Sequence, residues 1–600
     1  MKKRVLALLL AVVMIVGCFA ACTGNNNTSS GNTNANTNST ATNNGNTDGD
    51  TNVPDETPTA GGPDDTTEHY DYTVYYNYGA WSRIWGEDEY TAYLNDRFNI
   101  SATWSAGEND PDGKLNLMMS SGDMPDSIVT ERGAIHNKVA RAGLLVDLET
   151  LMYDGCSFAE DIPESVRSML KVDGKLYGMP NWARKGATGG NYQWMVNSAV
   201  YEELGSPSLK TFEELHDFAV AAKNAGLKSY NGQDVIPFYT QTDNGYEIYR
   251  SIYRSMGKPG IAMGYFTQED GKLELGVRDE SFVKALSIAN DWFNEGLFPA
   301  EVFTDSSDQL VEKATNGRPA LFWYDFSQDD GNNFRNITLK NSGGSTDYLV
   351  VGFDVEAGGM QFPGMDGVTV TYGDEAGGVG WNVNCITTSA KNPQRIFDVT
   401  TFMLTPEGSL MMQYGPVGGT MLESIDTSGD LPMPVLKKPI ADFTDDEKNA
   451  TGSWFWSQPA QSDYVDGIKF ALNDQLPEDK QNWVVTRQAH LCSYTADDPK
   501  IGQKFMTDQL TGVDGVVDPQ EDLGIKYKSI TDECKAKIPG IIMATSKDEF
   551  NKLVADLVKY CESNSVDEIL EKFQAKFDEN VAAQGFNAYS AEYDVYKLNG

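Results

Sequence analysis

The stretch KLNLMMSSGDMPDSIV (residues 114–129) shows the alternation of helix and strand that decides the fold. Its apolar residues from Leu115 to Met119 indicate a helix. We expect that helix to end at Gly122, because glycine readily adopts the left-handed conformation of a helix C-cap. Residues 127–129 are apolar or small and predict a strand directly after the turn.

The same alternation continues on the N-terminal side of this stretch. YTVYYN (residues 72–77) predicts a strand, and residues 100–104 predict another. Between them Tyr90, Leu94 and Phe98 recur at helical spacing. Strands that alternate with helices are typical of a mainly parallel α/β sheet, so we expect an α/β fold.

Helix signals also recur towards the C-terminus. Residues 208–226 carry a capping box, Thr211 with Glu214, and end in Gly226. Residues 546–563 and 565–582 predict two closing helices, and Asp173-Gly174 predicts a hairpin turn. The body from residue 68 to residue 600 is too long for one core, which predicts two lobes or more.

The N-terminus has the layout of a secretory signal. Lys2, Lys3 and Arg4 precede an apolar run (residues 5–17) that is too short to span a bilayer comfortably. FAAC, which ends at Cys22, resembles the lipobox of bacterial lipoproteins, in which the cysteine thiol receives a lipid. IVGC, ending at Cys18, also fits the box, and an ordinary cleaved signal is the other alternative. We expect residues 1–22 to be a lipoprotein signal with Cys22 as the lipid attachment site.

A polar segment of low complexity follows the signal. Residues 23–67 consist mostly of Asn, Thr, Gly, Ser, Asp and Pro, and they have no apolar period from which a core could form. We expect a disordered tether whose ends lie about 35–40 Å apart on average. Such a tether would let a globular body reach both solvent and a membrane partner.

Charge and motifs exclude several classes of function. The formal net charge of −40 disfavours nucleic acid as a partner. No zinc-protease, serine-hydrolase or nucleotide-binding motif occurs, and the four histidines are scattered. The 87 acidic residues leave a glycosidase open, because any fold would offer accidental carboxylate pairs. The five cysteines beyond Cys22 are interpreted as buried small residues with at most one or two disulfide bridges.

Five sequence blocks resemble, in order, those of the extracellular solute-binding proteins of carbohydrate ABC importers in Gram-positive bacteria, the LipO-like lipoproteins. These blocks are SGDMPD within residues 114–129, GLLVDLETL (143–151), VDGKLYGMP (172–180), WFNEGLFPAEVF (292–303) and the segment from NPQRIF to GPVGG (392–419). The resemblance implies a two-lobed α/β fold, periplasmic-binding-protein-like (type II), with an interlobe ligand cleft. It also implies lobes that are discontinuous in sequence, the first formed mainly by residues 68–183 and a returning segment near 375–425.

Two departures from the family pattern matter. Asn197 and Ser198 stand where family members usually carry an arginine and an aspartate. The family's calcium loop corresponds here to KNAGLKSYNGQDVIPF (223–238), which keeps Asn231 and Asp234 but lacks the other acidic oxygens. Calcium takes six to eight oxygen ligands. We therefore expect no calcium and no other cofactor.

Aromatic and polar residues at strand ends and in glycine-flanked loops are the candidates for a sugar site. Aromatic rings stack on the C–H faces of pyranoses, and carboxylates and amides bind the hydroxyls. The alternative for each aromatic is packing in a core, to which we assign Trp292, and the alternative for Asp123 is to hold its turn. The candidates are Trp81, Asp123, Asn181, Trp182, Trp323, Trp381, Tyr414 and Trp456.

The sequence therefore predicts a non-enzymatic, monomeric lipoprotein, anchored to the extracellular face of the cell membrane, that captures a carbohydrate, an oligosaccharide above all. Its expected partners are the permease subunits of an ABC importer. A secreted glycan-degrading enzyme, or a binder of a peptide or other nutrient, is the alternative.

Overall fold

The computed structural model divides into the units Met1–Thr57 and Pro58–Gly600, and every residue described below belongs to the second unit. The described residues are 62–79, 83–181, 183, 192–240, 245–256, 258, 265–269, 271–325, 329–351, 374–376, 379–429, 431–452, 454, 457–486 and 504–584. Among these residues, no helix is both long and apolar enough to cross a membrane.

Five strands form the first sheet, in the order β2-β1-β3-β14-β6. Strand β1 (Tyr70–Tyr76) pairs in parallel with β2 (Ile100–Ala106) and with β3 (Ser127–Glu131). Strand β14 (Asn382–Ile386) runs antiparallel to both β3 and β6 (Met179–Pro180). The predicted parallel sheet is therefore found in β1 to β3, and β14 runs in the opposite direction.

The helices around this sheet begin and end where the sequence indicates. Helix α2 (Glu89–Phe98) starts at Asp88, whose side chain accepts a hydrogen bond from the Thr91 amide, and it buries Tyr90, Leu94 and Phe98. Helix α3 (Pro111–Ser121) ends at Gly122 with φ 74°, as predicted. The other elements of this half are α4 (Ala134–Arg141), α5 (Ser157–Glu160), α6 (Glu164–Met169), β4 (Lys171–Val172), β5 (Lys175–Leu176), α13 (Pro393–Met403), α14 (Pro406–Tyr414), β15 (Leu422–Asp426), β16 (Met433–Leu436), α15 (Asp445–Thr451) and α16 (Ser462–Asp474).

The second sheet has the order β12-β7-β11-β8. Strand β11 (Pro319–Asp325) pairs in parallel with β8 (Ile236–Thr240) and antiparallel with β7 (Tyr192–Asn197), which also pairs antiparallel with β12 (Tyr348–Val350). This sheet is mixed, unlike the mainly parallel sheet that the alternation predicts, because β7 runs against its neighbours.

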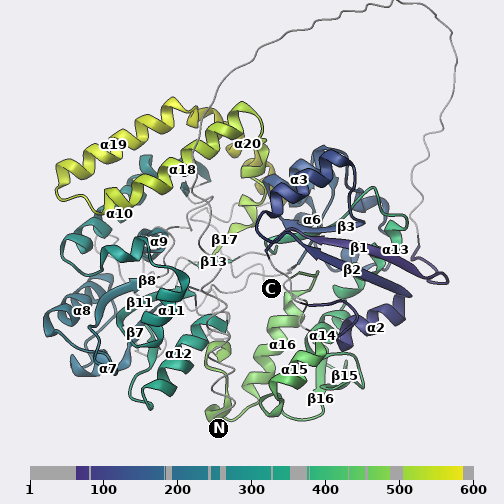
Figure 1. Ribbon diagram of the computed structural model, residues 1–600, viewed down its shortest axis with the longest axis horizontal. Coiled ribbons are helices and arrows are strands. Elements are labelled where there is room, and N and C mark those ends of the chain that lie inside the picture. The colour runs from purple at the N-terminus through teal and green to yellow at the C-terminus, as the bar shows by residue number, and fades with distance from the viewer. Residues whose placement is uncertain are drawn as a thin grey trace, which may run out of the picture. The chain divides into compact units, whose positions relative to one another are not determined.

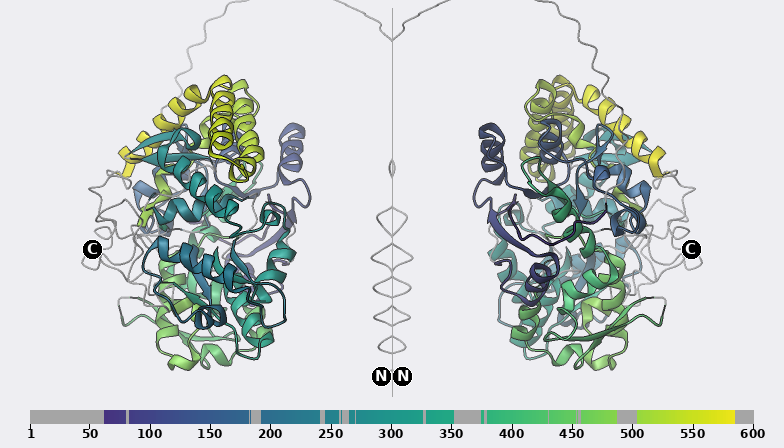
Figure 2. Two further views of the ribbon diagram at one scale, coloured as in Figure 1. Left: turned by 90° about the vertical axis from the view of Figure 1, so that its left-hand side faces the viewer. Right: turned by 90° about the vertical axis from the view of Figure 1, so that its right-hand side faces the viewer.

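Helices pack on the second sheet and extend beyond it. The predicted capping box of α8 (Phe212–Ala225) is present, and Gly226 ends the helix in the left-handed conformation. The closing helices are present as α19 (Lys547–Ser563) and α20 (Val566–Gln584), beside α18 (Asp522–Ile542). Figure 2 shows these yellow helices gathered at one end. The remaining elements are α7 (Ser198–Glu203), α9 (Tyr246–Ser255), β9 (Phe266–Glu269), β10 (Lys272–Leu275), α10 (Glu280–Asn294), α11 (Ser307–Thr315) and α12 (Asp329–Asn341).

Two separate hydrophobic cores define the two lobes. Lobe 1 has a core built from residues 72–183 and 379–468, and lobe 2 has a core built from residues 194–351 and 483–577. Strand β13 (Asp374–Ala376) pairs in parallel with β17 (Lys504–Met506), and Figure 1 shows this pair between the two sheets. The predicted two-lobed α/β architecture is thus present, with lobes that are discontinuous in sequence.

The borders of lobe 1 differ from the expected ones at two places. Its core includes Phe443, Trp454 and Ile468, so the returning segment continues beyond residue 425. Its contacts also begin at Asp64, inside the predicted tether, because the Asp64 carboxylate forms an ion pair with buried Arg395. The residues at the end of the predicted tether resemble the preceding ones in composition, so composition alone does not reveal where the tether ends. The ion pair with buried Arg395 holds Asp64 against lobe 1.

Candidate functional site

Four strands meet at one edge of the lobe 1 sheet, which we call the carboxyl edge of lobe 1. Strands β1, β3 and β6 end there, and β14 begins there, because β14 runs antiparallel to β3 and β6. The edge therefore carries Asn77, Arg132, Asn181 and Trp381. In open α/β sheets, ligands bind outside the carboxyl ends of the strands.

Hydrogen bonds fix the backbone of this edge. The Arg132 amide donates to the Trp381 carbonyl at 2.9 Å, and the Asn181 amide donates to the Asn382 carbonyl at 3.0 Å. The Asn181 side-chain oxygen in turn accepts from the Asn382 amide at 3.2 Å. The loops that present these side chains are therefore held to the sheet and to one another.

Asn77 has one hydrogen-bonding atom without a partner. Its side-chain amide nitrogen donates to Asp112 Oδ1 at 2.8 Å and to Thr130 Oγ1 at 3.1 Å. Its Oδ1 is buried and accepts no hydrogen bond from the protein. A buried acceptor without a partner costs free energy, and a ligand hydroxyl or a water can satisfy it.

Charged groups accompany the neutral amides at this edge. Burial, together with the charges of Asp514 and Asp112, raises the pKa of Glu131, and Arg132 opposes that shift. The Arg132 guanidinium donates to Thr511 Oγ1 at 2.7 Å. Thr511 lies in the segment before α18, and Val513 of the same segment belongs to the core of lobe 2. The carboxyl edge of lobe 1 therefore contacts lobe 2.

Lobe 2 has a corresponding edge. Strands β8 and β11 end where β7 begins, since Asp325 pairs with Tyr192 and Trp323 pairs with Thr240. Helix α9 follows β8 and buries charged as well as apolar side chains. Glu247, which is 3% exposed, accepts from the Trp323 indole at 3.1 Å and from Arg250 at 2.7 Å.

Gln193 lies at the same edge of lobe 2. It occupies the second position of β7 opposite Tyr324, and its side chain is fully buried. Neither its amide oxygen nor its amide nitrogen has a hydrogen-bond partner in the protein. An amide offers both acceptor and donor to a sugar hydroxyl.

The polar residues of this edge in lobe 2 are not among the candidates predicted from the sequence. Glu247, Arg250 and Arg254 are spaced i, i+3 and i+7 in YEIYRSIYRS and therefore share one face of α9. That spacing is visible in the sequence, but charged residues on one helix face usually contact solvent. Burial of this face is a property of the tertiary structure.

The described candidates fall into three groups. Trp381, which is 41% exposed, and buried Asn181 lie together at the carboxyl edge of lobe 1. Trp323 is buried in the core of lobe 2, and Tyr414 is buried in the core of lobe 1. Their side chains are therefore packed in a core, which is the alternative given for each aromatic candidate. Asp123 precedes β3, at the opposite edge of the sheet, and its amide donates to Ser121 Oγ at 3.3 Å. Trp81, Trp182, Trp456 and Cys22, the predicted lipid-attachment residue, lie outside the described residues.

The loop around Asn231 and Asp234 is linked by its own side chains. The Lys228 ammonium forms an ion pair with Asp234, and Asn231 bonds to Ser229 and Gln233. Within the described part of the chain, no group of three or more His, Cys, Asp or Glu side chains is placed to hold a metal ion. The Asp234 carboxylate already has a protein cation as its partner.

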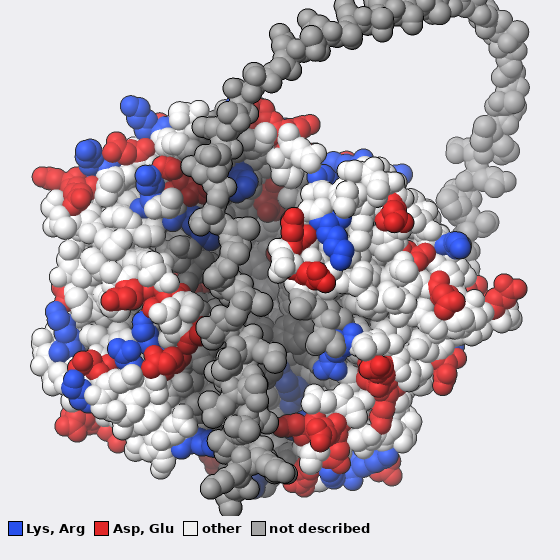
Figure 3. Space-filling view, in the orientation of Figure 1, with Lys and Arg blue, Asp and Glu red and all other residues white. Residues whose placement is uncertain are grey.

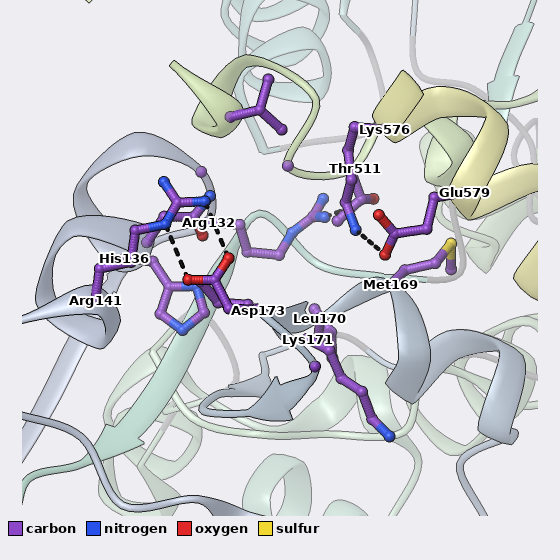
Figure 4. Close-up of a pocket in the computed structure, with 16 residues that line it drawn as sticks. Arg132, His136, Arg141, Met169, Leu170, Lys171, Asp173, Thr511, Lys576 and Glu579 are labelled. Atoms are coloured by element: carbon purple, nitrogen blue, oxygen red, sulfur yellow. Dashed lines mark hydrogen bonds and ion pairs between the residues drawn. The ribbon is translucent and has the colours of Figure 1, made fainter. Parts of the chain in front are cut away.

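Figure 3 shows acidic and basic side chains spread over both lobes. A cavity of about 200 Å³ lies between residues of lobe 1 and the C-terminal segments of lobe 2 (Figure 4). Lobe 1 contributes Arg132, His136 and Arg141, and the C-terminal segments contribute Thr511 and Lys576.

No family model matches this chain. It is similar to the fructooligosaccharide ABC transporter substrate-binding protein FusA of Streptococcus pneumoniae, with 23% identity over 251 residues. That match covers 40% of this chain and spans 46% of the length of the curated relative.

Solved structures share the fold over most of the chain. The alginate-binding protein AlgQ2 gives a TM-score of 0.60 at 15% identity and covers 86% of this chain and 99% of its own. FusA of S. pneumoniae in complex with kestose gives 0.59 at 18% identity, covering 85% and 99%. A human-milk-oligosaccharide (HMO) binding solute-binding protein from Bifidobacterium longum infantis gives 0.56 at 15%, covering 85% and 99%. The predicted two-lobed solute-binding-protein fold is confirmed.

Proposed function

We propose that this chain is a membrane-anchored extracellular solute-binding protein that captures an oligosaccharide and delivers it to an ABC importer. The observation that carries the proposal is the two-lobed fold whose sheet edges present an exposed tryptophan and two buried amide side chains, Asn77 and Gln193, with unpaired hydrogen-bonding atoms. FusA, AlgQ2 and the Bifidobacterium protein share this fold, and they are named as binding proteins for a fructooligosaccharide, alginate and human milk oligosaccharides.

The chemistry of the two edges suits a sugar. The Trp381 ring, 41% exposed, offers a face for the C–H groups of a pyranose. Asn77 Oδ1 and the Gln193 amide supply acceptors and a donor for hydroxyls, and each is buried without a protein partner. A ligand that touches both edges favours the closed arrangement of the lobes, because it gains contacts there that the open arrangement lacks.

Binding and release without chemical change is the part of the proposal that separates it from a glycan-degrading enzyme. The similar proteins carry names of binding and transport proteins. A glycosidase would need two carboxyl groups about 5–9 Å apart beside the sugar. At the described edges, the Asp112 carboxylate already accepts from Asn77, and Glu247 already accepts from Trp323 and Arg250.

The lipid anchor and the extracellular location are the part of this proposal that rests on sequence alone. The signal-like run before Cys22 and the polar residues after it support them. Metabolic labelling with a fatty acid should mark the wild-type chain and a Cys18→Ser chain but not a Cys22→Ser chain. Labelling of the Cys22→Ser chain would move the anchor to Cys18, and absence of label from all three would remove it.

A panel of oligosaccharides tests the binding function. At least one member should raise the melting temperature and change the tryptophan fluorescence, with no increase in reducing sugar on long incubation. Release of reducing sugar would favour the enzyme instead. A response confined to peptides would favour a peptide binder.

A further inference from the structure

The cavity in Figure 4 lies beside the carboxyl edge of lobe 1 and has walls from both lobes. One wall is α4 with the β4–β5 hairpin of lobe 1, and the other is the segment 511–516 with α20. Its volume of about 200 Å³ is smaller than that of sites for drug-sized ligands, which start at about 300 Å³. The cavity is therefore suited to a small ion or to a single sugar-acid unit.

The cationic side chains of the cavity are more deeply buried than their acidic partners. Lys576 is 12% exposed, whereas Glu579, its partner at 2.8 Å, is 66% exposed. Arg141 is 35% exposed, whereas its partner Asp173 is 67% exposed. Solvent screens an exposed carboxylate more than a buried ammonium, so the interior keeps a positive potential.

Figure 4 shows these two ion pairs on opposite sides of the cavity. The Arg132 side chain also lines it, while the Lys171 ammonium points away, toward Glu149 at 2.7 Å. The positive groups of the interior are thus Arg132, Arg141 and Lys576. This is a local excess of positive charge in a chain whose net charge is −40.

His136 supplies a second, independent observation. It lines the cavity, it is only 3% exposed, and its Nε2 atom is buried without a hydrogen-bond partner in the protein. Burial and the neighbouring Arg132 lower the pKa of His136 to about 4, so the ring is neutral at physiological pH. A neutral imidazole that carries its proton on Nε2 donates one hydrogen bond to an anion.

The start of α4 adds backbone donors. Gly133 lines the cavity and forms the N-cap of α4, and no side chain caps this helix. Uncapped amide groups at a helix N-terminus attract anions. The Asp514 carboxylate lies near Gly133 but is not among the lining residues, so it offsets part of this field without filling the cavity.

We propose that this cavity is a second ligand site, separate from the sugar-binding edges, that binds the oxyanion of a small ligand, a phosphate or a carboxylate. An anion bound there contacts Arg132, His136 and Arg141 of lobe 1 and Lys576 of lobe 2. It therefore joins the two lobes, and its binding is coupled to their closure. By reciprocity, the anion and the sugar each change the affinity of the protein for the other by the same factor.

Calorimetric titration of the full chain with inorganic phosphate, and separately with galacturonate, tests this inference at neutral pH and constant chloride concentration. We expect saturable binding in at least one arm, and the arm that responds identifies the source of the oxyanion. Lys576→Gln should weaken that binding by about tenfold or more, because a charge-assisted hydrogen bond is lost. Its partner Glu579 is exposed, so the variant should fold.

Lys528→Gln is the matched control. Lys528 lies on α18, is 73% exposed and pairs with Asp532, so the substitution makes the same charge change away from the cavity. An equal loss of affinity in this control would mean general electrostatic attraction and would overturn the proposal. Failure of both anions to bind the wild-type chain would overturn it as well. A sugar titration of the same protein keeps the two proposals distinct, because sugar binding without anion binding removes only this one.

Discussion

The Arg132 guanidinium of lobe 1 donates a hydrogen bond of 2.7 Å to the Thr511 hydroxyl, which belongs to the segment before α18. Two further bonds strengthen this contact, from Asn137 Nδ2 and Arg141 Nη1 to the Gly515 carbonyl at 3.1 and 3.2 Å. Asn580 of α20 holds the same segment from the other side. Residues 509–516 are thus hydrogen-bonded to lobe 1 on one side and to α20 of lobe 2 on the other. We call this segment the joint between the lobes.

We expect Thr511→Val to weaken this joint. The substitution keeps the shape of the side chain but removes the acceptor of a partly buried guanidinium, which costs about 1–2 kcal/mol. Urea denaturation should show that loss in the free energy of unfolding. Thr531→Val on α18, whose hydroxyl is exposed and bonds only to the Lys528 carbonyl, should change it by less than about 0.5 kcal/mol. Equal effects of the two variants would argue against a joint at Thr511.

Trp381 and Trp323 should respond to substitution in opposite ways. Trp381→Ala should weaken oligosaccharide binding with little effect on stability, because the ring is 41% exposed. Trp323→Ala should destabilise the fold by about 3–5 kcal/mol, because the ring packs on Trp194 in the core of lobe 2. Isothermal titration and thermal melts separate the two effects. Wild-type sugar affinity in Trp381→Ala would remove that ring from the site.

His136 should make stability depend on pH below neutrality. Its pKa is lowered from 6.5 to about 4 in the folded chain, so below pH 6.5 the unfolded state binds a proton that the folded state does not. This stability is fully present above pH 6.5 and decreases as the pH falls towards 4, by up to about 3 kcal/mol. Melting temperatures of wild type and His136→Gln across this range should converge on acidification. A constant difference would contradict the assignment.

Asp64 should matter for stability although it lies in a segment of tether-like composition. Its carboxylate is the acidic partner of Arg395, whose side chain is 2% exposed. Asp64→Ala should cost about 2–3 kcal/mol, less than for a fully isolated charge, since Arg395 also donates to the Glu68 and Phe98 carbonyls. Asp65→Ala is the control, because the Asp65 carboxylate bonds only locally, to exposed Thr67. Chemical denaturation of both variants measures the difference.

Calcium should leave the stability of the loop around Asp234 unchanged. The Lys228 ammonium is the partner of that carboxylate, and calcium needs several more oxygen ligands than the loop offers. Melting temperatures with excess calcium, with magnesium and with chelator should therefore coincide. A melting temperature that rises with calcium but not with magnesium would contradict this prediction and would indicate a calcium site.

The sequence predicts helix caps and turns correctly where they depend on interactions between residues close together in the chain. The capping box at Thr211, the C-cap at Gly122 and the hairpin turn at Asp173-Gly174 are all present, because each depends on residues within a few positions of one another. The direction of β7 and the burial of Glu247 depend instead on chain segments that are distant in sequence. Periodicity carries no information about those contacts.

The candidate site was predictable only in part for the same reason. Asn181 is a sequence candidate because it stands beside Trp182, and Trp381 because it lies in a glycine-flanked loop. The pairing of β14 with β3 and β6 brings the two to one edge. Trp323 also ends a strand, yet its side chain alternates to the face that packs on Trp194. The face to which a strand residue points depends on register, which the composition of its neighbours does not reveal.

The alternation of core segments between the lobes has a consequence for how the molecule can be divided. Because the lobe 1 core uses residues 72–183 and 379–468 while lobe 2 uses the residues between and after them, no single backbone cut releases a complete half. A protease nick in the exposed turn at Gly343-Gly344 would leave each fragment with parts of both cores. The fragments should stay associated under native conditions and separate only when the whole structure unfolds.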